Sequence, residues 1–206
     1  MLPGPTIVKK CSECSKLIRE PTILSGNTFG AVFWTDGKRE APMLPDHPWL
    51  VKCPHCQTLI WIDELEIMEE IEPFEFDNEA RGLAPMEPSL EEYHDFLQQE
   101  TLGAEKERYV RLRAWWAGND LRRASGENHP LSESERGNLE SFAEILDQSD
   151  GGDRIMTVEI RRELGQYDKA LALLTEPFDD ELTEAVGIIK DLVEKQDPYV
   201  ARMLFD

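Results

Sequence analysis

Two Cys-x-x-Cys pairs, Cys11–Cys14 and Cys53–Cys56, contain all four cysteines of this chain. Each pair can present two thiolates to one metal ion from a tight turn, and two such turns supply the four sulfur ligands of a tetrahedral zinc site. A site closed by four thiolates has no open position for water or substrate, so its role is structural. The sequence therefore predicts one structural Zn²⁺ ion, held by Cys11, Cys14, Cys53 and Cys56.

Three other uses of the cysteines stay open at the level of sequence. Iron in a rubredoxin-like site takes the same four ligands. Disulfides are disfavoured, because the chain opens with Met1-Leu2-Pro3-Gly4-Pro5 and shows no apolar signal segment behind a basic start, so we expect a reducing, cytoplasmic environment. A thioredoxin-like redox pair is followed by a helix, whereas the β-type run Leu59-Ile60-Trp61-Ile62 follows the second pair. Neither His47 nor His55 is expected to bind the metal, because four thiolates complete its coordination.

The acidic charge of the chain is concentrated in its later part. Of the formal net charge of −20, residues 1–61 carry +2, from seven Lys and Arg against five Asp and Glu, so the remainder carries −22. A chain this acidic is repelled by phosphate, which argues against nucleic acid as a partner. No stretch approaches the roughly 20 apolar residues of a membrane span. We therefore expect a protein partner, a basic one being favoured by the charge, and neither nucleic acid nor a membrane.

Residues 1–62 are predicted to form a small antiparallel β zinc ribbon. Between the two cysteine pairs lie 38 residues, more than in the commonest zinc ribbons. This insert contains a run of β-formers at residues 28–34. The run is followed by Thr35-Asp36-Gly37-Lys38, in which the glycine can adopt the positive φ of a hairpin turn.

Residues 63–88 are interpreted as an acidic connector. The segment 63–92 contains twelve acidic residues and one basic residue, Arg81, together with three prolines. A short helix is expected at Glu64–Glu72, and the remainder is expected to be a solvated linker. The functional alternative is a docking strip for a basic protein, in which aromatic anchors lie between acids. Its candidate residues are Glu69, Glu70, Glu72, Phe74 and Phe76.

From residue 89 to residue 206 the apolar periodicity is helical, so the predicted fold class is α+β. Capping boxes at Ser89/Glu92 and Ser132/Glu135 mark two helix starts. Helical periodicity follows each box, and we expect further helices at 104–117, 153–164, 167–174 and 180–195. A final turn or two is expected at 198–205, beginning with a proline.

The segment Glu163–Leu174 resembles the middle of a tetratricopeptide repeat. Gly165 closes one helix, Tyr167 lies between two helices, and the small Ala170 permits their close approach. A weaker match to the repeat follows 31 residues later, where Ala201 and Leu204 correspond to Ala170 and Leu173. The pattern predicts a short stack of helical hairpins, with Tyr167 as a candidate partner-binding residue.

The chain as a whole resembles a family of uncharacterised bacterial proteins that combine an N-terminal four-cysteine zinc ribbon with a C-terminal tetratricopeptide-like helical region. The motifs that carry the resemblance span residues 26–30, 34–37, 51–56 and 115–120. The resemblance implies an architecture and no activity. One departure is Gln57, since the usual zinc-ribbon knuckle has glycine at this place.

The segment Trp115–Arg123 is the densest cluster of special residues outside the cysteine pairs. It is interpreted as a helix end, with Gly118 as the C-cap. The alternative is a pocket in which Arg122 and Arg123 recognise a carboxylate or phosphate. The sequence contains no phosphate loop, nucleotide fingerprint, serine elbow or paired metal-binding histidines.

The expected function is therefore that of a non-enzymatic, zinc-binding adaptor or scaffold, whose protein partner docks on the helical repeat or the acidic connector. No small-molecule substrate is identified. One alternative is an acidic inhibitor or immunity protein that neutralises a basic partner. A second is an enzyme of unrecognised class with a site near Trp115–Arg123.

Overall fold

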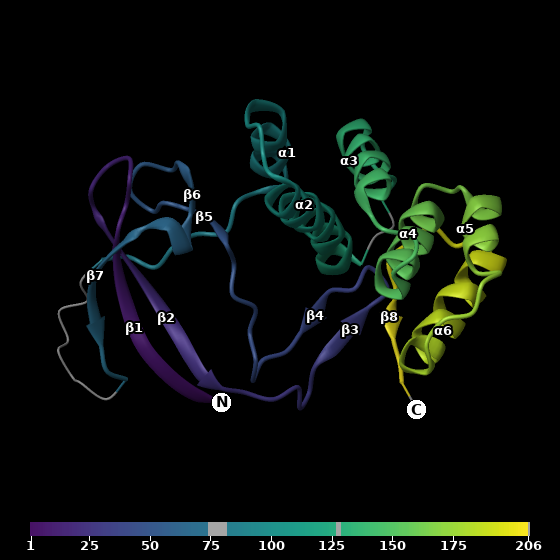
Figure 1. Cartoon of the computed structure of the whole chain (residues 1–206), viewed down its shortest axis with the longest axis horizontal. Coiled ribbons are helices and arrows are strands. Elements are labelled where there is room, and N and C mark those ends of the chain that lie inside the picture. The colour runs from purple at the N-terminus through teal and green to yellow at the C-terminus, as the bar shows by residue number, and fades with distance from the viewer. Residues whose placement is uncertain (74–81, 127–128, 206) are drawn as a thin grey trace. The chain divides into compact units, whose positions relative to one another are not determined.

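The computed structural model describes residues 1–73, 82–126 and 129–205. The fold is α+β, as the sequence predicts, with small antiparallel sheets in the N-terminal part and six α-helices in the described C-terminal part (Figure 1). The chain divides into two compact units. The β unit comprises Met1–Ala31 and Glu40–Ser89, and the helical unit comprises Val32–Arg39 and Leu90–Asp206.

The β unit is built on a three-stranded antiparallel sheet. Strand β1 (Leu2–Lys10) lies in the middle, between β2 (Leu17–Ser25) and β7 (Glu66–Ile71). A second, two-stranded sheet pairs β5 (Leu50–Lys52) with β6 (Leu59–Trp61). A single 3-10 turn, η1 (Ile62–Glu64), links β6 to the segment that leads into β7.

Strand β7 corrects the expectation of a short helix at Glu64–Glu72. Residues Glu66–Ile71 are extended and pair with β1, so that Glu70 lies opposite Ile7 and Glu69 opposite Val8. The backbone of β1 supplies non-local hydrogen bonds that outweigh the local helix preference of glutamate. Of the proposed aromatic anchors, Phe74 and Phe76 lie outside the described residues.

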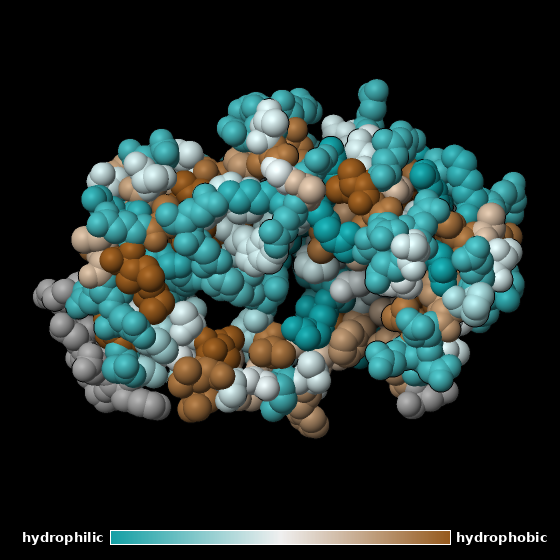
Figure 2. Space-filling model, in the orientation of Figure 1, coloured by the Kyte–Doolittle hydropathy of each residue, from teal (hydrophilic) through white to brown (hydrophobic). Residues whose placement is uncertain are grey.

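The helical unit contains six consecutive helices, and each packs against the next along the chain. Hydrophilic residues predominate on the face of this unit that Figure 2 shows. One core cluster joins Trp115, Phe142 and Ile160, and a second joins Val158 and Ala170 to the last helix. The helices are α1 (Leu90–Gln99), α2 (Ala104–Ser125), α3 (Glu133–Ile145), α4 (Gly151–Glu163), α5 (Tyr167–Leu173) and α6 (Thr183–Glu194), the last preceded by a 3-10 turn, η2 (Asp180–Leu182).

Several helix ends differ from those predicted; α6, for example, begins at Thr183 and not at 180. The predicted end at Gly118 is wrong, because α2 continues to Ser125 and is capped by Gly126, whose φ is +66°. Gly118 is instead a position of close approach, since a Cβ placed there would lie 2.4 Å from Glu135 Oε1. Helix α4 begins at Gly151, two residues before the predicted start, with Asp150 as its N-cap.

The capping box at Ser132 and Glu135 is confirmed at the start of α3. Its side-chain and backbone groups satisfy each other reciprocally, so this helix start is encoded locally. No helix in the described ranges is long and apolar enough to cross a membrane; α2, the longest, is rich in charged residues.

A small sheet is formed by residues 32–40 and 202–203, all of which but Glu40 belong to the helical unit. The hairpin of β3 (Val32–Trp34) and β4 (Arg39–Glu40) turns through Gly37, whose φ of +78° confirms the predicted hairpin turn. On its other side β3 pairs with β8 (Arg202–Met203). The expected helical turn at 198–205 is therefore wrong, because β3 offers this segment backbone partners that an isolated last turn lacks. The weaker match to the repeat also fails, because Ala201 and Leu204 are not helical.

Candidate metal centre and buried polar network

The four cysteines meet in the β unit at the spacing that a tetrahedral metal requires. Their Sγ atoms all lie within 4.8 Å of one another. The two distances that join opposite pairs are 3.9 Å for Cys11–Cys56 and 3.8 Å for Cys14–Cys53. A metal bound tetrahedrally at about 2.3 Å from each sulfur sets the sulfur atoms about 3.8 Å apart. The cluster can therefore bind one metal ion with four thiolates.

Each Cys-x-x-Cys pair forms a turn with the same pattern of hydrogen bonds. The Cys11 N–H donates to the Lys16 carbonyl, and the Cys53 N–H donates to the Thr58 carbonyl, each at 2.9 Å. The Cys11 and Cys53 carbonyls accept from the residues four places on, each at 3.0 Å. Those two residues are Ser15, with φ of +60°, and Gln57, with φ of +66°. Gln57 thus adopts the left-handed conformation that glycine usually provides in such a turn.

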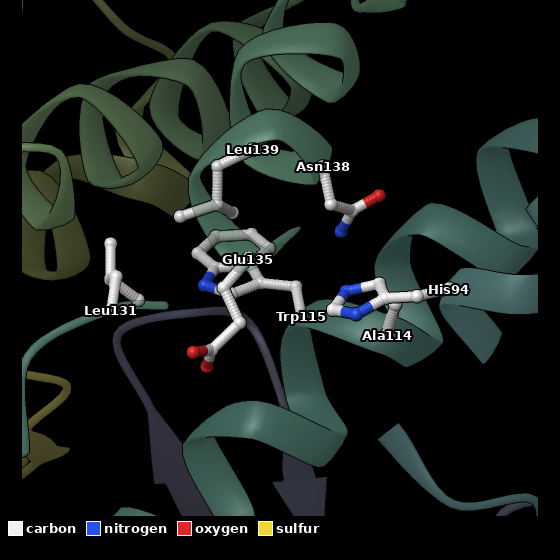
Figure 3. Close-up of a pocket in the computed structure, with 7 residues that line it drawn as sticks. All are labelled: His94, Ala114, Trp115, Leu131, Glu135, Asn138 and Leu139. Carbon is white, nitrogen blue, oxygen red and sulfur yellow. The ribbon is translucent and has the colours of Figure 1, made fainter. Parts of the chain in front are cut away.

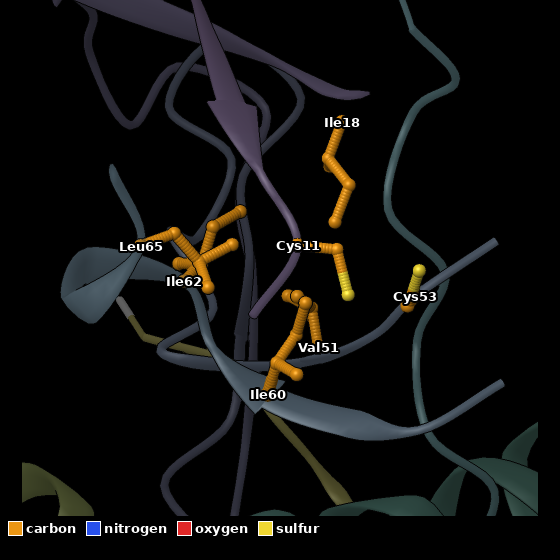
Figure 4. Close-up of a cluster of buried hydrophobic side chains, with 7 residues drawn as sticks. All are labelled: Cys11, Ile18, Val51, Cys53, Ile60, Ile62 and Leu65. Atoms are coloured by element: carbon orange, nitrogen blue, oxygen red, sulfur yellow. The ribbon is translucent and has the colours of Figure 1, made fainter. Parts of the chain in front are cut away.

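The thiols lie in a mixed environment. Cys11 and Cys53 belong to a buried cluster with apolar side chains from β2, β5, β6 and the segment after it, as Figure 4 shows. Burial raises the pKa of the Cys53 thiol to about 12, whereas hydrogen bonds from Thr58 lower the pKa of Cys56 to about 6. Because a metal is bound by thiolates, metal binding displaces the proton of Cys53 and couples its affinity to pH.

Neither histidine near the cysteines joins them. The Nε2 atom of His55 lies 3.1 Å from the Leu17 carbonyl oxygen. His47 lies between two carboxylates, with Nδ1 3.3 Å from Glu20 and Nε2 3.5 Å from Asp63. These three side chains form a second cluster of potential metal ligands. The buried Lys9 ammonium lies 2.6 Å from Glu20, so this cluster already contains its compensating cation.

In the helical unit, the segment Trp115–Arg123 forms the centre of a buried polar network and not a helix end. Asn119 donates to Asp36 at 2.9 Å and to Glu163 Oε1 at 3.0 Å. Trp115 Nε1 donates to the other oxygen of Glu163 at 2.9 Å. Arg123 forms an ion pair with Asp36. The hairpin turn, α2 and the end of α4 are thereby tied together.

Arg162 forms the second buried ion pair of this network. It has no exposed surface, and its Nε donates to Glu159 at 2.8 Å. Its other nitrogens reach the Asp197 carbonyl and, at 3.4 Å, Thr35 Oγ1. Thr35 accepts in turn from the Ala201 N–H at 3.0 Å, which fixes the segment before β8.

The buried charges of the network do not balance. Three buried carboxyl groups, on Asp36, Glu159 and Glu163, face two guanidinium groups, on Arg123 and Arg162. Burial, followed by the charges of Glu159 and Asp36, raises the pKa of Glu163 to about 8. Glu163 therefore keeps its proton at neutral pH, and the network is neutral as a whole.

The other predicted site residues are placed as follows. Glu69 is partly buried on β7, while Glu70 and Glu72 are exposed. Tyr167 packs beside the Ala170 cluster, and its hydroxyl donates to the Gln196 carbonyl at 2.8 Å, so it stands at a seam between helices. Arg123 is used inside the network and is not a free anion-binding group.

Sequence reasoning did not single out Glu163, although a signal existed. Trp115, Asn119 and Arg122 recur at positions i, i+4 and i+7 of one helix, so two polar residues lie on its apolar stripe. Such residues are buried and need partners. The space around Trp115 itself is filled by His94, Leu131, Glu135 and Leu139 (Figure 3) and admits no water-sized molecule.

Comparisons of the chain with models of protein families, with curated proteins and with solved structures each found no match. The functional argument therefore rests on the side chains described above.

Proposed function

We propose that this chain is a non-enzymatic zinc-binding protein that works as an adaptor or scaffold for a protein partner. The observation that carries the proposal is the closed set of four thiolates, with sulfur atoms 3.8 and 3.9 Å apart across the cluster. Four sulfur ligands satisfy zinc completely and leave no position for a substrate. A β unit with four clustered cysteines followed by a helical region agrees with the resemblance to uncharacterised bacterial proteins that combine a zinc ribbon with tetratricopeptide-like helices.

Zinc is the proposed ion because the role proposed for the metal is structural. Cys11 and Cys53 are themselves members of the buried cluster that forms the core of the β unit. A metal that joins the two knuckles contributes its binding free energy to the folding of this unit. No redox partner group accompanies the cysteines among the described residues, and a structural role suits an ion without redox chemistry.

The proposed docking element is the acidic strand β7. It carries Glu69 and Glu70, it is followed by Glu72, and it is an outer strand of the described sheet. The formal charge of −22 beyond residue 61 supports long-range attraction of a basic partner. An inhibitor that neutralises a basic protein would use the same residues. The two roles differ in salt sensitivity, because a charge-driven complex weakens steeply as ionic strength rises.

The test uses the full chain, since β7 pairs with β1 and a fragment that begins at residue 63 would lose that pairing. The partner is captured from the native cell with tagged wild-type protein and identified, and its binding is then measured with purified components. The charge variant is Glu69→Gln, Glu70→Gln and Glu72→Gln combined. The matched control removes three exposed acids of the helical unit, through Glu140→Gln, Glu144→Gln and Glu181→Gln.

We expect about one zinc ion per chain by elemental analysis of the same sample. We also expect slower association and a flatter salt dependence for the β7 variant than for the control, since both lose the same charge. Iron in place of zinc would refute the metal assignment. Equal binding by the two variants would refute β7 as the docking element. A purified chain that turned over a substrate would refute the non-enzymatic role.

A further inference from the structure

One cavity of the helical unit is used by neither the metal centre nor the acidic strand. It has a volume of about 230 Å³ and lies between α2, α3, the end of α4 and the segment before β8. All of its lining residues belong to the helical unit, so its shape is fixed within one compact body. Asn119 and Glu163 lie at its inner end, and Arg122, His129 and Arg136 are among the polar residues that line it.

Glu163 supplies a hydrogen-bond donor at this inner end. It is 4% exposed, and each of its carboxyl oxygens already accepts a hydrogen bond, from Trp115 or from Asn119. A protonated carboxyl group also carries one O–H to donate. Glu163 also lines the cavity, so an O–H on this carboxyl group can be directed into it. A ligand oxygen in the cavity would accept a hydrogen bond from this O–H.

Arg136 gives the cavity a positive charge in an otherwise acidic chain, and Arg122, whose charge is balanced by Glu135, adds N–H donors. Arg122 is held by an ion pair with Glu135 at 2.8 Å and donates to the His129 carbonyl at 3.0 Å. Arg136 is exposed, and no acidic partner for it is found among the described residues. An unpaired guanidinium is notable in a chain with 42 acidic and 22 basic residues. It offers a charge-assisted pair of donors for a planar anion.

The rest of the lining is apolar enough to cover a carbon skeleton. Leu131, Val200 and Tyr199 are among the lining residues. A cavity of about 230 Å³ limits the ligand to a small molecule. The N-terminal N–H groups of α3 do not offer a phosphate site, because the capping box with Ser132 occupies them.

We propose that this cavity binds a small organic acid in its carboxylate form. The carboxylate lies between the guanidinium groups of Arg136 and Arg122 and the hydroxyl of Glu163. Its short apolar body lies against Leu131 and Val200. Hydrogen-bond donors of two kinds, the charged guanidinium groups and the neutral carboxyl group of Glu163, then converge on one carboxylate.

Binding should depend on the protonation of Glu163, because an ionised Glu163 repels a carboxylate. The polar and ionisable groups around Glu163 lie on each of the elements that pack against it. Trp115 and Asn119 of α2 donate to it, and Asp36 of the hairpin turn, with its partner Arg123, lies beyond Asn119. On α4 itself are Glu159 and Arg162. Across the cavity are the ionisable groups Arg122, His129, Arg136 and Tyr199. With a pKa raised to about 8 by burial, Glu163 loses its proton above that pH.

The test measures ligand binding to the full, metal-loaded chain by calorimetry and ligand-observed NMR. The probes are butyrate and benzoate as organic carboxylates, benzamide as the neutral analogue of benzoate, and inorganic phosphate. Each is measured at pH 6.5 and pH 9. The variants are Arg136→Gln and Glu163→Gln. The matched control is Lys169→Gln, which removes one positive charge from an exposed position of α5.

We expect a carboxylate to bind at pH 6.5 and to bind about tenfold more weakly at pH 9. Arg136→Gln should weaken binding about tenfold through the loss of a charge-assisted contact, and Lys169→Gln should not. Glu163→Gln keeps a neutral donor, so it should bind at pH 6.5 within about threefold of wild type and lose the pH dependence. This retained binding separates a ligand contact from a merely structural role.

Four results would overturn the proposal. They are the absence of carboxylate binding at about 10 mM, equal binding of benzamide and benzoate, displacement of benzoate by an equal concentration of phosphate, and equal effects of Arg136→Gln and Lys169→Gln. Circular dichroism of each variant shows whether it is folded. None of these outcomes bears on the zinc content or on the partner of β7, so this inference and the proposed function fail separately.

Discussion

The variant Glu163→Gln tests the charge imbalance of the buried network through its effect on stability. In the folded chain the pKa of Glu163 is about 8, raised mainly by burial from an ordinary value of 4.5. The folded state therefore holds the proton more tightly than the unfolded state. Below pH 4.5 both states carry it and the stabilising contribution is complete. As the pH rises toward 8 only the unfolded state releases it, so stability is lost.

The magnitude follows from the same two values. Each pKa unit corresponds to 1.36 kcal/mol, so the 3.5 units between 4.5 and 8 amount to about 5 kcal/mol once the pH exceeds 8. At pH 7 the loss is about 3 kcal/mol. Glutamine has the same shape and no proton to lose in either state. Near pH 5 we expect Glu163→Gln to be somewhat less stable than the wild type, because its amide NH2 cannot accept one of the two hydrogen bonds from Trp115 and Asn119. Between pH 5 and pH 8 it should gain several kcal/mol in free energy of unfolding relative to the wild type.

The assay is urea unfolding from pH 5 to pH 8.5, followed by circular dichroism at 222 nm. This signal reports on the helical unit, because every described α-helix lies there. Glu181→Gln, at an exposed position of the same unit, is the control and should show no such trend. A constant difference between Glu163→Gln and wild type across this pH range would refute the argument, as would a variant that loses stability relative to wild type at high pH.

Three further predictions concern the metal and the packing of the helices. Serine in place of any one of the four cysteines should abolish stoichiometric zinc and unfold the β unit, which elemental analysis and limited proteolysis would detect; a folded, metal-free β unit would contradict this. Gly118→Ala should lower the free energy of unfolding by about 2 kcal/mol, because its Cβ would lie 2.4 Å from Glu135 Oε1 and disturb the Glu135 ion pair. The control Gly187→Ala in α6, where nothing lies within 4 Å, should stabilise the helix by up to about 1 kcal/mol. Equal thermal shifts for the two variants would exclude the close approach at Gly118. Ala170→Leu should cost about 1–3 kcal/mol, since Ala170 is fully buried against Val158, Ile189 and Val193, and an unchanged melting temperature would show that this seam has spare room.

The sequence by itself determined the features that depend on neighbouring residues. Two Cys-x-x-Cys pairs predicted a four-cysteine cluster, and the α+β fold class followed from β-type runs before residue 62 and helical periodicity after residue 89. The hairpin turn at Gly37 and the capping box at Ser132 were also predictable. Each of these rests on hydrogen bonds or ligand geometry within a few residues, so a short pattern specifies it.

Only the tertiary structure decided the features that depend on distant partners. Glu66–Ile71 forms a strand because its backbone pairs with β1, and Arg202–Met203 forms a strand because its backbone pairs with β3. Helix α2 passed through Gly118 and Asn119 because Glu135, Asp36 and Glu163 occupied the space beside them. The proton on Glu163 likewise arises from burial beside Asp36, a residue 127 positions earlier in the chain. A pattern of residue types records local preference, whereas the pairing of strands and the balance of buried charges are set by what each segment meets in space.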